Sequence, residues 1–201
     1  MGFTELIQSY DIYMLDVIHK IFVNGGTNAF WKIVTLFGDD GIFWIALGLL
    51  LVVFRRTRKD GTAMLIAIVT GFIVGNMVLK NAVGRIRPYD VNLLVPVVVE
   101  HLSDYSFPSG HTMASLGAAL ALFYREKKAG IPAVVLAVLI MVSRLHLYVH
   151  YPSDVLGGLI VGTIAGVIAT LISEHVIPKR FFTADFIRKR KKGAHEQTAT
   201  E

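Results

Sequence analysis

The chain contains 201 residues, of which 54% are hydrophobic, and its mean hydropathy is +0.57. This apolar fraction exceeds the roughly 45–50% that is typical of soluble domains, so the composition indicates one domain of a membrane protein. The chain has no cysteine. A disulfide framework, a thiolate metal site and a cysteine nucleophile are therefore excluded.

The net charge of +5 does not indicate a nucleic-acid partner, because the positions of the basic residues have another explanation. Fourteen of the twenty lie in three clusters, at 55–59, 125–128 and 179–192, and each cluster adjoins the end of an apolar segment. Cytoplasmic loops of membrane proteins are enriched in Lys and Arg. The clusters therefore predict cytoplasmic loops of a multi-pass protein in the cell membrane, with the carboxyl terminus inside.

The first part of the chain predicts helices that associate with the membrane. Residues 5–22 have apolar positions at helical spacing and acids on another face, which favours an interfacial helix. The stretch 24–27 breaks this helix, 30–37 predicts a short apolar helix, and 38–41 predicts a turn held within the protein. We divide the chain into N-terminal helices (1–37), a membrane core (38–178) and a basic cytoplasmic tail (179–201).

Five apolar segments of the core are expected to cross the membrane. They are residues 41–54, 62–79, 112–124, 131–142 and 155–173. Residues 5–22 form a sixth span if they also cross. The predicted fold is therefore all-α, an integral membrane bundle of five or six transmembrane helices. Glycines recur at four-residue spacing in the last segment, at Gly158, Gly162 and Gly166, and predict close helix packing.

The stretch 143–154 places Arg144, His150 and Asp154 between two apolar segments. Ionisable groups at such a position usually carry function or are paired. Pro152 suits the first turn of a helix, and a carboxylate two residues later can orient one ring nitrogen of the histidine and leave the other free as a nucleophile or base. The alternative is a helix start in which Asp154 is only a cap.

Four basic residues lie on the predicted outer side, in the loop 80–107 and the stretch 144–154, where the positive-inside bias disfavours them. They are Lys80, Arg85, Arg87 and Arg144, and a bound anion would account for them. Alternatively, Asp90, Glu100 and Asp104 balance the three in the loop.

A helix start lies between these basic groups, at residues 107–112. Its Ser109 and Gly110 leave backbone N–H groups free to bind phosphate, with His111 beside them. The same residues are also compatible with a simple helix cap. Together with His150 and the cations, they supply a nucleophile, a proton donor and positive charge for phosphoryl transfer. Clustered cations disfavour Mg²⁺ or Zn²⁺, so we expect neither a metal nor a cofactor.

At these residues the sequence resembles the type 2 phosphatidic acid phosphatase superfamily, whose core is shared with vanadium haloperoxidases and glucose-6-phosphatase. The first motif matches Lys80, six residues and Arg87-Pro88; the second matches Pro108 to His111; the third matches Ser143-Arg144, His150 and Asp154. The resemblance implies a metal-independent helical core. It also implies that His150 forms a phosphohistidine, Asp154 orients it and His111 protonates the leaving group. Phosphate-binding roles are implied for Lys80, Arg87, Ser109, Gly110 and Arg144.

We therefore expect a lipid phosphatase that acts at the outer leaflet. The expected substrate is undecaprenyl diphosphate, which is released on that side, and Arg85 is expected to add a fourth cation for the extra charge of a diphosphate. Phosphatidylglycerophosphate and phosphatidate are the alternative substrates. A lipid phosphotransferase, a transporter and a non-catalytic scaffold are more remote alternatives, although transporters usually show repeats, which this sequence lacks. The sequence leaves the oligomeric state open.

Overall fold

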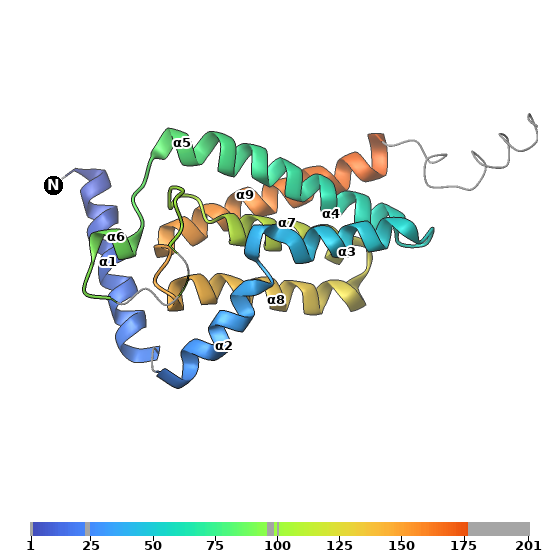
Figure 1. The fold of residues 1–201 in the computed structure, drawn as a ribbon. Coiled ribbons are helices and arrows are strands. Elements are labelled where there is room, and N and C mark those ends of the chain that lie inside the picture. The colour runs from blue at the N-terminus through green and yellow to red at the C-terminus, as the bar shows by residue number, and fades with distance from the viewer. Residues whose placement is uncertain (1, 23–24, 96–98, 100, 177–201) are drawn as a thin grey trace, which may run out of the picture.

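The computed structural model describes residues 2–22, 25–95, 99 and 101–176, and within these every regular element is a helix (Figure 1). The longer helices are α1 (Phe3–Phe22), α2 (Gly25–Leu36), α3 (Ile42–Val53), α4 (Arg58–Gly71), α7 (Gly110–Arg125), α8 (Lys127–His146) and α9 (Pro152–Leu171). The shorter ones are η1 (Asp39–Gly41), η2 (Phe72–Leu79), α5 (Lys80–Val83), α6 (Pro88–Val91) and η3 (Ile172–Val176). The predicted all-α fold is confirmed.

Four helical stretches among the described residues are long and apolar enough to cross a membrane. They are Gly26–Val53, Arg58–Val91, Lys127–His146 and Pro152–His175, and they contain four of the five predicted core spans. The remaining predicted span lies in α7, whose 16 residues fall short of the roughly 20 that a span normally needs. Helix α7 packs against α4, α8 and α9 and forms the centre of the bundle.

The contact between α7 and α9 depends on the three predicted packing glycines. A Cβ atom added at Gly158, Gly162 or Gly166 would lie 2.8–2.9 Å from a backbone carbonyl oxygen at or near α7. Because backbone atoms cannot move aside as a flexible side chain can, any larger residue would push the helices apart. The predicted packing role of these glycines is confirmed.

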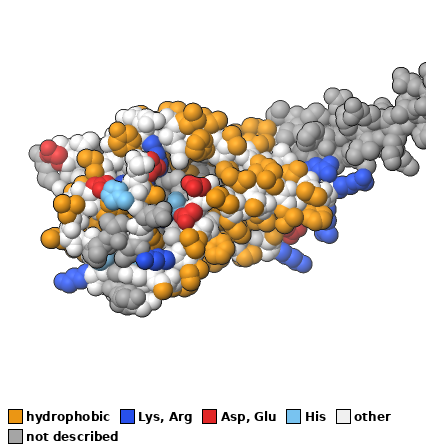
Figure 2. Space-filling view, in the orientation of Figure 1, with side chains coloured by type: hydrophobic (Ala, Val, Ile, Leu, Met, Phe, Trp, Pro, Cys, Tyr) orange, Lys and Arg blue, Asp and Glu red, His pale blue; other side chains and the backbone are white. Residues whose placement is uncertain are grey.

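The helices around α7 present apolar side chains outward. Exposed examples are Leu49, Leu50, Val69, Ile73, Val135, Val138, Ile160, Ile164 and Val167. Figure 2 shows hydrophobic side chains over the half of the visible face that leads to the basic end of the bundle. An apolar surface of this extent is what a lipid-facing belt requires, because lipid tails solvate apolar side chains.

Helix α1 crosses the other end of the bundle, where α8 ends and α9 begins (Figure 1). Two of its acidic side chains bond to the bundle: Asp11 is 2% exposed, and Asp16, although exposed, accepts a hydrogen bond from the Tyr148 hydroxyl at 2.6 Å. Tyr13 and Ile21 of α1 are exposed. The face of α1 that contacts the bundle combines Asp11 with the fully buried Leu15, so apolar and acidic residues share it and the predicted separation of the two faces is wrong.

Ion pairs join the helix ends at the opposite end of the bundle. Arg125 donates to Asp60 at 2.6 Å and also pairs with Glu174, which lies 3.6 Å from Lys59. The first two predicted basic clusters lie at this end, and the third lies outside the described residues. The predicted site histidines, His111 and His150, are therefore separated from the basic clusters by the length of the bundle.

Candidate active site

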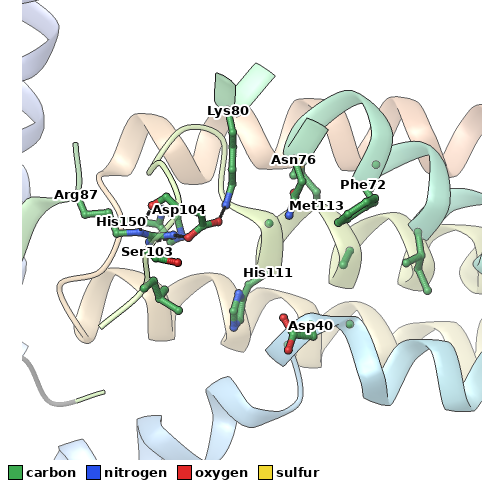
Figure 3. Close-up of a pocket in the computed structure, with 17 residues that line it drawn as sticks. Asp40, Phe72, Asn76, Lys80, Arg87, Ser103, Asp104, His111, Met113 and His150 are labelled. Atoms are coloured by element: carbon green, nitrogen blue, oxygen red, sulfur yellow. Dashed lines mark hydrogen bonds and ion pairs between the residues drawn. The ribbon is translucent and has the colours of Figure 1, made fainter. Parts of the chain in front are cut away.

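A cavity of about 310 Å³ opens between η1, η2, the start of α7 and the junction of α8 with α9. Five of the eight predicted site residues line it, namely Lys80, Arg87, Gly110, His111 and His150 (Figure 3). The other three are buried beside it: Asp154 and Ser109 lie behind its wall, and Arg144 lines an adjoining cavity. The fold therefore gathers residues from three separate parts of the chain.

Asp154 is held by the first turn of α9. Pro152 occupies the start of this helix, and Asp154 Oδ2 accepts a hydrogen bond from the Tyr151 backbone N–H at 2.9 Å. The same oxygen lies 3.5 Å from His150 Nδ1 and accepts a hydrogen bond from the Ser106 hydroxyl at 2.5 Å. The two interpretations of this carboxylate are therefore compatible, since it caps the helix and faces the histidine at the same time.

The orientation of His150 follows from these contacts. Its Nδ1 faces Asp154, while Nε2 lies 3.3 Å from a guanidinium nitrogen of Arg87 at the cavity wall. Burial lowers the pKa of His150 to about 3, and the charges of Arg87 and Arg144 act in the same direction against the opposing effect of Asp154. A neutral imidazole with Nε2 unprotonated is the form that can attack an electrophile.

Lys80 and Arg87 converge on the carboxylate of Asp104 from two sides (Figure 3). Arg87 Nη2 donates to Asp104 Oδ1 at 2.6 Å, and Lys80 pairs with the second oxygen. Burial alone would raise the pKa of Asp104, but the hydrogen bond from Lys80 and the charge of Arg87 outweigh it and lower the pKa to about 2. The alternative that acidic residues of the loop balance its cations is therefore confirmed for Asp104, which pairs with Lys80 and Arg87.

His111 points into the cavity from the first turn of α7, and its Nε2 lies 2.7 Å from Asp39 Oδ1. The ring packs directly on Gly38, where an added Cβ would lie 2.7 Å from it. This tight approach explains why the turn before α3 begins with glycine. The sequence analysis did not assign Asp39 to the site, although the polar turn between two apolar segments was a signal that could have found it.

The start of α7, at Ser109 and Gly110, is the predicted phosphate-binding site. The Ser109 side chain makes no capping hydrogen bond to this helix, and its hydroxyl instead accepts one from Thr112 at 3.0 Å. The Ser109 backbone N–H donates to the Asp154 carbonyl at 3.1 Å. This hydrogen bond connects the start of α7 to α9. Gly110 lines the cavity, and the first-turn amides of a helix have no partner within it and can bind an anion.

The prediction that Arg85 adds a fourth cation to the phosphate site is wrong. Its guanidinium donates to Asp154 Oδ1 at 2.7 Å, to Asp11 Oδ2 at 2.6 Å and to Gln8 Oε1 at 2.6 Å. It also lies 4.0 Å above the centre of the Tyr151 ring. Two carboxylates already compensate its charge, and it lines neither the cavity of His150 nor the adjoining one.

The acidic and histidine side chains of the described residues contain no group of three or more that could hold a metal ion. The cavity presents Lys80 and Arg87 in addition to two histidines. The carboxylates of Asp40 and Asp104 also line it, and Asp104 pairs with both cations. Their positive charge is therefore available to an anion where that carboxylate is shared or displaced.

Comparison with known proteins gives related sequences over most of the core. A family model described as the PAP2 superfamily matches residues 60–177. An undecaprenyl-diphosphatase of Sulfolobus acidocaldarius is 35% identical over 121 residues, covering 60% of this chain and 58% of that protein. The undecaprenyl-diphosphatase BcrC of Bacillus subtilis is 32% identical over 149 residues, covering 73% and 77%. Phosphatidylglycerophosphatase B of the same organism is 36% identical over 139 residues, covering 64% of each chain.

Two solved structures share the fold. The crystal structure of a transmembrane PAP2-type phosphatidylglycerolphosphate phosphatase from Bacillus subtilis superposes with a TM-score of 0.69 at 29% identity, covering 86% of this chain and 88% of that one. The structure of LpxE from Aquifex aeolicus gives a TM-score of 0.66 at 23% identity, covering 79% and 93%, and shows the likeness of fold alone.

Proposed function

Because this chain belongs to the PAP2 superfamily, as its motifs predicted, we propose that it is an integral-membrane lipid phosphatase. We propose further that it converts undecaprenyl diphosphate to undecaprenyl phosphate through a phosphohistidine. The observation that carries the proposal is the geometry of His150, with Nδ1 toward Asp154 and Nε2 toward a cavity lined by Lys80 and Arg87. This arrangement supports a nucleophile directed at a bound phosphate.

In the proposed reaction, His150 Nε2 attacks the terminal phosphorus and the bond from phosphorus to the leaving oxygen breaks. Asp154 keeps the ring in the tautomer that carries its proton on Nδ1 and stabilises the positive charge that develops on the ring. His111 gives a proton to the leaving oxygen. Water then attacks the phosphohistidine and releases inorganic phosphate, while His111 takes the proton of that water.

The groups that we propose to hold the transferred phosphate are Lys80, Arg87, Ser109, Gly110 and Arg144. Asp104 now bridges Lys80 and Arg87, so an incoming phosphate must share or replace that carboxylate. Cations and amides can neutralise the equatorial oxygens without a metal. Activity is therefore expected to survive EDTA, and vanadate is expected to inhibit as a five-coordinate mimic.

The choice of substrate is supported by two of the relatives, which are named undecaprenyl-diphosphatases. Another relative is named phosphatidylglycerophosphatase B, so phosphatidylglycerophosphate is the second candidate, followed by phosphatidate. The test compares kcat/KM for these three lipids with purified protein in one detergent. A tenfold preference for either glycerophospholipid, equal to about 1.4 kcal/mol of barrier, would contradict the diphosphatase proposal.

We also propose that the site faces the outer side of the cell membrane. The support is the separation of the cavity from the basic residues 55–59 and 125–128, which favour the cytoplasm. Since the chain lacks cysteine, single cysteines can report orientation. Asn92→Cys is expected to react with an impermeant thiol reagent on intact cells and Thr57→Cys is not; the reverse result would overturn this topology.

A further inference from the structure

Asn76 is a polar residue of the cavity wall that neither the matched motifs nor the proposed mechanism uses. It belongs to η2, within the membrane-length stretch Arg58–Val91, and it lines the cavity that contains His150. The exposed side chains around it in η2 are all apolar: Phe72, Ile73, Val74, Met77 and Val78. A polar amide in such a stretch is costly in a membrane, and side chains of this kind usually carry function or are paired.

The backbone of η2 brings this amide to the start of α7. The Lys80 N–H donates to the Gly75 carbonyl five residues earlier, which is the pattern of a π-helix, a rare form that often occurs at functional sites. Gly75 is buried, and a Cβ atom added there would overlap the Met113 side chain of α7. This close approach leaves the next side chain, that of Asn76, directly beside α7.

The Asn76 amide therefore adjoins the predicted phosphate-binding site. A Cβ atom added at Gly110 would lie 3.3 Å from Asn76 Oδ1 and 3.5 Å from Nδ2. Lys80 follows four residues after Asn76, about one helical turn, and lines the same cavity. In Figure 3 these two side chains point into the cavity from the same side. An anion bound by Lys80 and the first amides of α7 would also contact Asn76.

The amide of Asn76 makes no hydrogen bond to any residue that the structure describes, unlike the other asparagine of this stretch. Asn81 is exposed, and its Nδ2 donates to the Met77 carbonyl of its own helix at 2.8 Å. Both hydrogens of the Asn76 amide are thus free to bind a molecule in the cavity.

We propose that Asn76 is a further substrate-binding residue, which donates a hydrogen bond to a non-bridging oxygen of the phosphoryl group that His150 attacks. The inference rests on the proposed function and adds to its phosphate-binding residues one that lies outside the three motifs. A donor that is fixed beside these oxygens before the reaction stabilises the five-coordinate transition state without reorganisation.

The test replaces Asn76 with Leu, which has a similar size and no donor. The purified full-length wild type and variant are compared by phosphate release from farnesyl diphosphate in one detergent. Loss of a hydrogen bond to a charged group is worth about 10–100-fold, so kcat/KM is expected to fall by that factor. Inhibition by vanadate, which has no lipid tail, is expected to weaken about tenfold. Unchanged vanadate inhibition would overturn the proposed contact.

A second variant tests the sign of the interaction. Asn76→Asp keeps the shape of the side chain but places a carboxylate beside the phosphate, so its kcat/KM is expected to fall further than that of Asn76→Leu. Asn81→Leu is the matched control, because Asn81 does not line the cavity. It is expected to keep both kcat/KM and vanadate inhibition near the wild-type values.

The thermal stability of the variants separates binding from a structural role. Asn76→Leu is expected to keep or raise Tm in detergent, since it removes an unpaired amide from an apolar helix. A fall in Tm together with the loss of activity would assign Asn76 to the packing of η2 and overturn the proposal. A wild-type protein that releases no phosphate would instead refute the proposed function.

Discussion

The guanidinium of Arg85 lies 2.7 Å from Oδ1 of Asp154, while Oδ2 of the same carboxylate faces Nδ1 of His150. Asp11 of α1 binds the same guanidinium at 2.6 Å and accepts a hydrogen bond from the Ser153 backbone N–H at 3.0 Å. A continuous line of buried contacts thus runs from the first helix to the proposed nucleophile. Arg85 positions the carboxylate that positions the histidine.

Replacing Arg85 with Gln is expected to lower kcat by about 10–100-fold, the usual effect of losing a group that orients a reacting residue. KM is expected to change much less, because Arg85 does not line the cavity. The measurement is the separation of kcat from KM, with Arg85→Lys retaining more activity than Gln. Arg55→Gln, at the opposite end, is the control. A rise in KM at constant kcat would instead assign Arg85 to substrate binding.

Replacing His150 with Ala is expected to reduce turnover by several orders of magnitude without loss of the folded protein, because no other group supplies the attacking nitrogen. Asp154→Asn is expected to cost less, since it misorients the ring without removing it. Rapid quenching with a radiolabelled lipid phosphate is expected to trap acid-labile phosphohistidine in the wild type and none in His150→Ala. Label retained in that variant would disprove the assignment.

Replacing His111 with Ala is expected to cost about 10²–10⁴-fold on a lipid phosphate, the usual contribution of a proton donor. On an aryl phosphate with an acidic phenol the loss is expected to be much smaller, because that leaving group needs no proton. Asp39→Asn is expected to share this pattern in weaker form, as the residue that holds His111 at 2.7 Å. Equal losses on both substrates would indicate a binding role for the histidine.

The stability of the protein is expected to fall as the pH drops from 7.5 to 5, in part because of His150. An unfolded histidine takes up its proton near pH 6.5, whereas burial holds the pKa of His150 at about 3 in the folded protein. The unfolded state therefore binds the extra proton within this range, so the contribution is complete above about pH 6.5 and is lost as the pH falls.

The check is the change in Tm between pH 7.5 and 5 for the wild type and His150→Asn in detergent. The variant is expected to lose less. Asp104 is not expected to contribute over this range, because its pKa lies near 2 when folded and at 3.8 in the reference state. An identical pH dependence in the two proteins would contradict the buried neutral histidine.

Replacing Gly162 with Ala is expected to destabilise the protein by about 1–3 kcal/mol, the usual cost of overpacking. The added carbon would lie 2.9 Å from the Met113 carbonyl oxygen. Gly71→Ala is the matched control, since its added carbon would meet nothing closer than 3.8 Å, and it is expected to be neutral or slightly stabilising. Thermal unfolding in detergent measures both, and equal effects would refute the packing role.

Local sequence patterns predicted those structural features that depend on interactions between neighbouring residues. Pro152 and Asp154 predicted the start of α9, because helix capping involves neighbouring residues. The apolar runs predicted most of the bundle. The central position of α7 was not predictable, because the hydrophobic pattern of a helix does not tell which other helices pack around it.

The carboxylate of Asp39 was missed for a related reason. Asp39 lies 72 residues before His111, which it contacts, and no local pattern selects a partner at such a separation. Arg85 follows Gly84, whose φ of 61° turns the chain, and a side chain after such a turn has no direction that a sequence pattern can give.

The buried carboxylate of Asp11 on α1 also bears on how the protein is made. Asp11 finds its partners at Arg85 and Ser153, which are synthesised long after it. Until those segments are in the membrane, a carboxylate on the first helix has nothing to neutralise it and remains at the water interface. The guanidinium of Arg85 that Asp11 binds also holds the carboxylate facing His150. The docking of α1 and the alignment of the proposed catalytic pair therefore depend on the same side chain.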